Sequence, residues 1–336
     1  MDIALTSLAF LFSALCVGVM GFAIQRGATC TVAAVDEVVG RRSFRRLVAL
    51  VEASVWVAGG LLVAQWLNVL PKMPPGYELS GWTVLGGALL GLGAFVNGAC
   101  VFGAIALFGS GRWTQLLMPL GFYLGCLSVN TVFEPPARAA LPYGSPVLQA
   151  PAWVAAAFLA FVAWRLLRSV LTGGPGPASV SLVRRAREAL ATSVWAPHAA
   201  TTVIGVTFLF TLLLAGAWAY TDLLAALARG MATNVVARCL LALALLIGAA
   251  WGGWTAGRFK GTRVTTAQAL RSLAGGVLMG WGSLLIPGSN DGLILVGMPL
   301  LWPYAWAAFV AMVVTIAAAQ AIRAIGFASP ERSRAP

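Results

Sequence analysis

The chain has 336 residues, of which 60% are hydrophobic and only 10% are charged, and its mean hydropathy is +0.88. A soluble domain carries about 25% charged residues, so the composition excludes an ordinary soluble protein and predicts an all-α polytopic membrane protein. The formal net charge of +12 gathers in a few loops, as the positive-inside bias requires. This clustering argues against nucleic acid as a partner and leaves the lipid bilayer as the expected surroundings.

Apolar runs near the length that spans hydrocarbon recur along the whole chain, and we expect nine transmembrane helices from them. They cover residues 3–25, 47–70, 86–111, 114–131, 152–170, 200–220, 236–256, 272–287 and 302–325. Residues 29–38 and 291–300 are too short to cross and are typical of half-helices or re-entrant segments. Residues 221–234 are expected to form a short interfacial or external helix.

Basic residues mark alternate loops and so orient the chain. Four arginines gather within residues 41–46, whereas the proline-rich loop 71–81 carries one lysine. A basic connector at 171–198 divides the chain into an N-terminal transmembrane half, 1–170, and a C-terminal half, 199–336. The pattern predicts that the N-terminus lies outside and that the C-terminus and the connector lie in the cytoplasm.

The stretch Gly86–Gly111 combines an apolar composition with eight glycines and an Asn97-Gly98 pair. Glycine costs about 1 kcal/mol relative to alanine within a helix, so either a neighbouring backbone packs very close or the helix breaks. Broken segments at membrane depth occur only where they are buried in protein or line a cavity. Cys100 follows the break directly, where a helix N-terminus would attract an anion, and is therefore a candidate pathway residue.

Cys30 stands at a similar place, after Gly27 and between a long apolar run and a short one. A free cysteine often packs as a small hydrophobe, but the break and the adjacent Arg26 favour a function for Cys30. Arg26 is a candidate anion attractor; alternatively Asp36, Glu37 or a lipid headgroup holds it.

The remaining cysteines, Cys16, Cys126 and Cys239, lie in uninterrupted apolar runs and are interpreted as packing residues. Only one histidine, His198, is present, so the sequence offers no convincing set of histidine and cysteine metal ligands. We expect neither a metal nor a cofactor.

The segment Pro287–Gly292 is the strongest interruption in the second half of the chain. Gly288, Ser289, Asn290 and Asp291 would also suit an extracellular turn, but the segment lies between two glycine-rich apolar pieces without a nearby basic residue. A re-entrant break at depth is therefore preferred. Together with the break after Asn97 it suggests the paired interruptions of repeat-built transporters.

Glu52 lies about 9 Å into its predicted helix, counted from Arg46 at the usual rise per residue. Acidic residues inside the membrane are functional candidates, and Glu52 is a candidate for proton coupling. A structural ion pair with a nearby arginine is the equally supported alternative.

At its breaks the sequence resembles the YeeE/YedE family, whose members are bacterial inner-membrane proteins that take up thiosulfate and related sulfur compounds. The matching pieces are GFAIQRGATC, GLGAFVNGACVFG and GGVLMGWGSLLIPGSNDGLILVGMPLLWPYAWAAFVAM. The resemblance implies nine transmembrane helices with short partially penetrating ones, two pseudo-symmetric halves, and three cysteines along a narrow path. Two of those positions correspond to Cys30 and Cys100, and the third corresponds to Ser289.

The resemblance makes uptake of thiosulfate or a related sulfur anion the first hypothesis, and a neutral thiol suits it as a weak donor that lets an anion move on. The alternative is a sulfur relay in which Cys30 or Cys100 carries sulfur to a small cytoplasmic sulfur-carrier protein. A third reading is a sensing or docking subunit. Walker A and HExxH motifs are absent, which argues against an enzyme.

Overall fold

The computed structural model describes residues 7–134, 137–172, 193–231 and 234–328, and these residues form helices and loops, with one isolated bridge between Tyr77 and Ala140. The long helices are α1 (Leu8–Gly27), α3 (Arg45–Trp66), α4 (Gly81–Asn97), α6 (Leu117–Val132), α7 (Ala152–Thr172), α9 (Pro197–Ala215), α11 (Val235–Thr255), α12 (Thr266–Leu285) and α14 (Pro303–Ala328). The short helices are α2 (Thr31–Arg41), α5 (Val101–Gly109), α10 (Tyr220–Ala228) and α13 (Asn290–Gly292), which continues into the π-helical turn η3 (Leu293–Gly297). Most of the basic connector expected at 171–198 lies outside the described residues.

The all-α polytopic architecture expected from composition is confirmed. Within the described residues, seven helices are long and apolar enough to cross a membrane, or eight if the bent pair of α12 with α13 and η3 counts as one span. The expected span 152–170 corresponds to α7, whose apolar described part, Ala152–Arg165, is shorter than the others. The expected span 3–25 and half-helix 29–38 form one apolar stretch, Leu8–Arg41, because α2 follows α1 after a short break.

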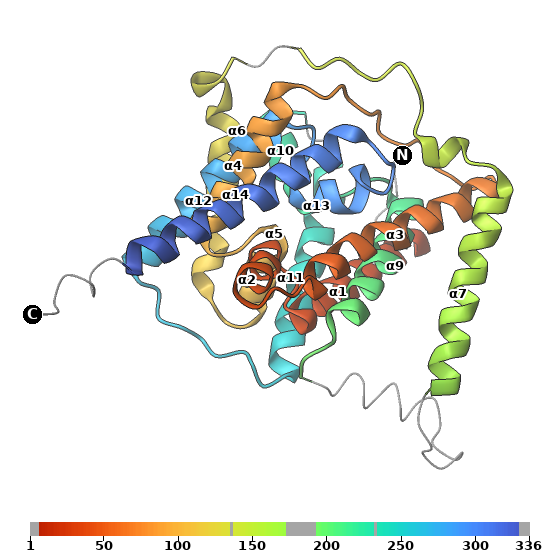
Figure 1. The fold of residues 1–336 in the computed structure, drawn as a ribbon, viewed down its shortest axis with the longest axis horizontal. Coiled ribbons are helices and arrows are strands. Elements are labelled where there is room, and N and C mark those ends of the chain that lie inside the picture. The colour runs from red at the N-terminus through yellow and green to blue at the C-terminus, as the bar shows by residue number, and fades with distance from the viewer. Residues whose placement is uncertain (1–6, 135–136, 173–192, 232–233, 329–336) are drawn as a thin grey trace, which may run out of the picture.

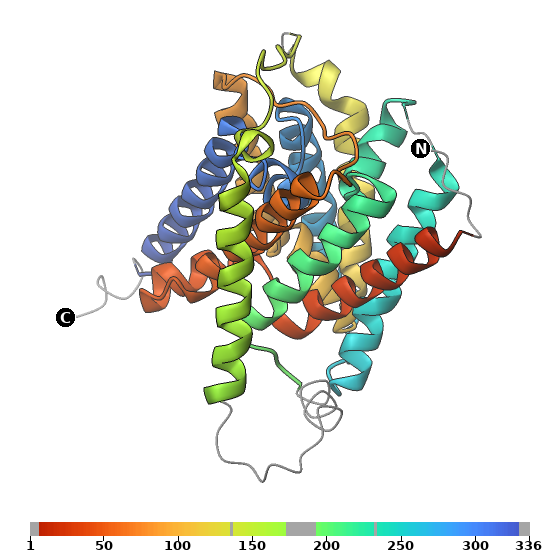
Figure 2. The ribbon, with the colours of Figure 1, turned by 90° about the vertical axis from the view of Figure 1, so that its right-hand side faces the viewer.

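Four units repeat the same order of a long helix, a break, a short helix and a second long helix. They are α1–α2–α3, α4–α5–α6, α9–α10–α11, and α12–α13–α14. Figure 1 shows the short helices toward the middle of the molecule, while α7 stands at its periphery. Figure 2 shows α7 running along the outside of the bundle, where Phe158 packs edge-on against Trp56 of α3.

The glycines of the third expected span serve two purposes. A Cβ atom at Gly93 would lie 2.6 Å from the carbonyl oxygen of Gly275, and one at Gly86 would lie 2.8 Å from that of Gly282, so α4 and α12 pack backbone against backbone. Small residues allow this close approach between helices in membranes. Gly98 instead ends α4 in the left-handed region, with φ of +75°, so close packing and a break are both present.

The two ends of α1 identify two opposite faces of the molecule. Phe10 lines a cavity with Pro71 and Lys72, whereas Gly27 lines a cavity with the arginines around position 41. A helix of 20 residues is about 30 Å long, comparable to the hydrocarbon core of a bilayer. We call these the proline-rich face and the basic face.

Candidate functional site

Each of the three residues predicted to form a path directly precedes a short helix. Cys30 is the N-cap residue of α2, Cys100 of α5 and Ser289 of α13, and all three have extended backbone conformations. The corresponding position before α10 is Ala219. Since an N-cap residue lies beside the unpaired N–H groups of the first turn, the breaks present two thiols and one hydroxyl at helix starts.

The breaks of the first two units meet at a pair of cysteines, Cys30 and Cys100, which we call the thiol pair. Thr31 directly follows Cys30, and its backbone N–H donates to the sulfur of Cys100 over 3.1 Å. Cys100 is fully buried. A Cβ at Gly103 would lie 2.4 Å from the sulfur of Cys30, so the glycine makes room for this thiol.

The third break forms a second group with α10, which we call the hydroxyl–carboxylate cluster: Thr221, Ser289 and Asp291. The two hydroxyls touch each other, and both donate to Oδ1 of Asp291, the Thr221 bond being 2.5 Å long. All three residues are at most 4% exposed. The segment 287–292 is therefore a buried break, bent by 50°, and not an extracellular turn.

Asn290 connects the two groups. Its Oδ1 accepts a hydrogen bond from the hydroxyl of Thr31 over 3.3 Å, which ties α13 to the start of α2. Its Nδ2 is fully buried and has no partner. The thiol pair, Asn290 and the hydroxyl–carboxylate cluster thus form one continuous buried polar region at the meeting point of four breaks.

Cavities approach this region from both faces. From the proline-rich face, a cavity of about 230 Å³ reaches Gly288 and Gly292, and Arg138, Arg229 and Asp222 line it. From the basic face, a cavity of about 440 Å³ reaches Gly27 and Ala28, and its walls include Arg41, Arg45, Arg46 and Arg258. Since Gly288 directly precedes Ser289 and Ala28 is two residues before Cys30, the buried polar region separates the two cavities.

Asp222 lies at the inner part of the cavity on the proline-rich face. A Cβ at Gly292 would be 3.7 Å from its Oδ2, so the carboxylate is next to the backbone that carries Asp291. Burial, and then the nearby negative charge of Asp291, raise the pKa of Asp222 to about 7. The cavity therefore presents one carboxyl group with a raised pKa beside two arginines.

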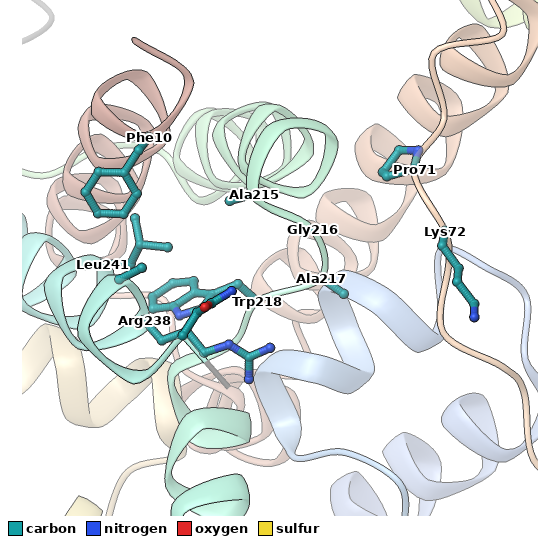
Figure 3. Close-up of a pocket in the computed structure, with 11 residues that line it drawn as sticks. Phe10, Pro71, Lys72, Ala215, Gly216, Ala217, Trp218, Arg238 and Leu241 are labelled. Atoms are coloured by element: carbon teal, nitrogen blue, oxygen red, sulfur yellow. The ribbon is translucent and has the colours of Figure 1, made fainter. Parts of the chain in front are cut away.

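A further cavity of about 470 Å³ opens at the proline-rich face between α1, the α9–α10 linker and α11. In Figure 3 Arg238 lies beside Trp218, while Lys72 stands on the opposite side of the cavity. Trp218 also lines a void of about 10 Å³ that touches Asp291. The lining of the larger cavity includes none of the residues predicted as a path.

Arg26 is completely buried beside the first break. Its guanidinium donates to Thr255 of α11 over 2.8 Å and stacks on Phe22, 4.9 Å from the ring centre. Glu37, one of the partners considered from the sequence, forms an ion pair with Arg46 at 3.0 Å. The observed contacts of Arg26 hold α1 against α11.

Asn97 and Gly98 shape the second break. The Asn97 Nδ2 group donates to the carbonyl of Ala99 over 2.8 Å and to the side chain of Gln115 over 3.1 Å, while Gly98 supplies the left-handed turn. Both donors of Asn97 are therefore occupied by the protein itself, and the pair sets the direction in which Cys100 and α5 start.

Glu52 lies away from the buried polar region, where α3 meets α7 and α9. Its carboxylate pairs with Arg165 and with His198 and accepts a hydrogen bond from Trp56 over 3.3 Å. This arrangement matches the structural ion pair that was the alternative to proton coupling, although the partner arginine comes from α7. His198 lies in the first turn of α9.

Sequence reasoning did not find Thr31, Gly103 or Thr221. Thr31 and Thr221 resemble many other threonines at helix starts. Their hydrogen-bond partners, which place them in the site, are 69 to 259 residues away in the chain. The order of short and long pieces could have indicated the fourth break, because Gly216 ends α9 with φ of +83° and α10 follows four residues later.

Long apolar helices, four breaks and a buried polar region between two cavities define a multi-pass membrane protein of the transport type. A family model described as sulphur transport matches residues 26–318. The match covers most of the chain, which therefore belongs to this YeeE/YedE sulphur transport family. A comparison with curated proteins gave no match. Membership supports a role in the transport of a sulfur compound.

Proposed function

We propose that this protein takes up thiosulfate, or a closely related sulfur oxyanion, across the bacterial inner membrane along Cys30, Cys100 and Ser289. The observation that carries the proposal is the meeting of these three helix-start residues in one buried polar region between two cavities. The anion would enter from the proline-rich face, taken as periplasmic, and leave at the basic face, taken as cytoplasmic.

The chemistry of the region suits a dianion that has to pass and not stay. The starts of α2 and α5, helices of 11 and 9 residues, direct partial positive charge toward the thiol pair. Neutral thiols, whose unperturbed pKa is about 8.5, are weak donors and match the soft terminal sulfur of thiosulfate. Conduction needs binding that is weak enough to release the ion at each position.

A sulfur relay to a cytoplasmic carrier protein ranks second. Such a relay needs a partner thiol to reach a reactive cysteine, and accessible thiols are the reactive ones. The Cys100 side chain is fully buried, whereas Cys30 is partly exposed, so burial argues against Cys100 as the thiol that a carrier protein would reach.

Uptake of radiolabelled thiosulfate into proteoliposomes tests the proposal. Cys100→Ala removes a donor to a charged substrate, worth roughly 1.5–3 kcal/mol, so uptake should fall about tenfold to a hundredfold, and Cys30→Ala should act similarly. Cys16→Ala is the matched control, because Cys16 is another buried free thiol outside the region. Wild-type rates in both path variants would show that the path is wrong; competition by sulfate, sulfite and selenite identifies the anion.

A further inference from the structure

Asp291 controls whether the hydroxyl of Ser289 can serve a passing anion. Ser289 and Thr221 both donate to Oδ1 of Asp291, and a hydroxyl has only one proton to donate. While Asp291 is ionised, both protons point at its carboxylate, which would also repel a dianion at this position. When Asp291 is protonated, the negative charge disappears and the hydroxyl of Ser289 is released to donate to the substrate.

A second, independent observation points to a ligand at the same place. Asn290 follows Ser289 and is fully buried, and its Nδ2 group has no partner among the residues that the structure describes, although buried polar groups in proteins are normally hydrogen-bonded. The other end of the amide is held by Thr31, so the unpartnered donor stays between the third break and the thiol pair. An anion acceptor at that point would satisfy it.

A second carboxylate, Asp222, lies between the cavity of the proline-rich face and Asp291. Asp222 lines the cavity there and lies next to Gly292, and its pKa is raised to about 7 by burial and by Asp291. It therefore lies between the cavity and the backbone that carries Asp291, where a proton could pass from one carboxylate to the other. Among the described residues, the charged and titratable groups that face the two carboxylates are Tyr220, Arg229, Arg238, Cys126 and Tyr304.

We propose that the protein is a proton–anion symporter in which Asp291 takes up one proton, by way of Asp222, for each anion that passes Ser289. The inference rests on the proposed function, since it concerns the same path. The proton binds the Asp291 carboxylate from the proline-rich face, the anion accepts the released hydroxyl, and the proton leaves toward the basic face as the anion moves on to the thiol pair. With a dianion, each cycle carries one net negative charge inward.

Proteoliposomes with the membrane potential clamped by valinomycin and potassium test the coupling. An imposed gradient of about one pH unit, acid outside, should drive accumulation of labelled thiosulfate by about tenfold, because one pH unit and one decade of concentration are the same free energy. Pyranine trapped inside should report one proton entering per anion. Thiosulfate uptake without a response to the gradient and without proton entry would overturn the symport while leaving the proposed function intact. No uptake under any condition would refute the proposed function itself.

The variants locate the coupling. Asp291→Asn replaces the carboxyl group by an amide of the same shape, which stays neutral like the protonated acid but cannot release a proton. Uptake down an anion gradient should therefore continue at a reduced rate, while the response to the pH gradient disappears. Asp36→Asn removes a carboxylate that is exposed on α2 and should keep that response. A full pH response in Asp291→Asn would overturn the assignment; if this variant does not transport at all, proton entry measured on the wild-type protein decides.

Discussion

The thiol pair and the hydroxyl–carboxylate cluster occupy equivalent positions at helix starts but differ in chemistry. At the thiol pair, the backbone N–H of Thr31, which directly follows Cys30, donates to the sulfur of Cys100, and among the described residues no carboxylate is hydrogen-bonded to either thiol. Ser289 instead donates to Asp291. One end of the buried polar region therefore carries soft thiols, whereas the other carries hard hydroxyl and carboxylate oxygens.

This difference suggests a division of labour along one path. A group whose donor is released by protonation can link transport to a gradient, and a group of weak, constant donors can let the anion move on. The family pattern of three cysteines would place similar chemistry at all three breaks. Serine at position 289 with aspartate two residues later gives this chain an asymmetric path.

The largest expected effect comes from crowding the thiol pair. In Gly103→Ala the new Cβ would lie 2.4 Å from the sulfur of Cys30, a distance that forces the thiol to move. Uptake should fall by more than about tenfold, since a displaced donor to a charged group is worth roughly 1.5–3 kcal/mol. The measurement is thiosulfate uptake by variant that elutes as a monodisperse peak in detergent.

Gly81→Ala is the matched control for this prediction. Gly81 begins α4 at an exposed position, and a Cβ there would meet nothing within 4 Å, so uptake should stay at the wild-type level. Wild-type uptake in folded Gly103→Ala would mean that the position of the Cys30 thiol does not matter for transport.

The breaks could be predicted from the sequence because each arises from local chain chemistry. Asn97-Gly98 and Pro287-Gly288 are pairs that favour a turn over a continued helix, and both glycines adopt positive φ. The polar residues that follow face the interior because an exposed broken backbone is costly in lipid. The fourth break was not identified, since Ala219 carries no polar side chain that would set it apart. The fourth break contributes to the site through Thr221, two residues after Ala219. The hydrogen-bond partners of Thr221, Ser289 and Asp291, are far away in the chain.

The role of Glu52 shows the same limit. Its depth in the helix follows from counting residues, but its partners Arg165 and His198 lie 113 and 146 residues away. Only the packing of α7 and α9 against α3 brings them together. From the sequence, Glu52 was equally suited to proton coupling and to a structural ion pair. The contacts that favour the ion pair depend on the packing of the helices and cannot be derived from the order of residues alone.

A smaller effect is expected when the two groups are made chemically alike. Ser289→Cys places a softer, weaker donor beside Asp291, so the preference for thiosulfate over sulfate should rise about fivefold, the ratio that roughly 1 kcal/mol gives. Competition of sulfate with labelled thiosulfate in proteoliposomes measures this ratio. Ser13→Cys is the control, because Ser13 is a buried serine whose hydroxyl bonds only within α1. An unchanged ratio would show that position 289 does not select the anion.

The smallest effect on transport is expected at Glu52, which tests whether coupling is confined to the hydroxyl–carboxylate cluster. Glu52→Gln weakens the ion pairs to Arg165 and His198, whose side chains are 36% and 38% exposed, so water screens part of the loss. We expect a destabilisation of about 1 kcal/mol, a fall in melting temperature of roughly 2–4 °C, and uptake within about twofold of the wild type.

The response of Glu52→Gln to an imposed pH gradient is the decisive measurement. Accumulation of thiosulfate should match that of the wild-type protein. Glu52 joins α3 to α7 and α9, and among the described residues it shares no hydrogen bond with Ser289, Asp291 or Asp222. A stable Glu52→Gln protein that transports but no longer accumulates would transfer the proton site from the third break to the α3–α7–α9 junction. Glu52 and Asp291 both lie within the helical bundle. Their hydrogen-bond partners, and not their depth, therefore distinguish a coupling acid from a structural one.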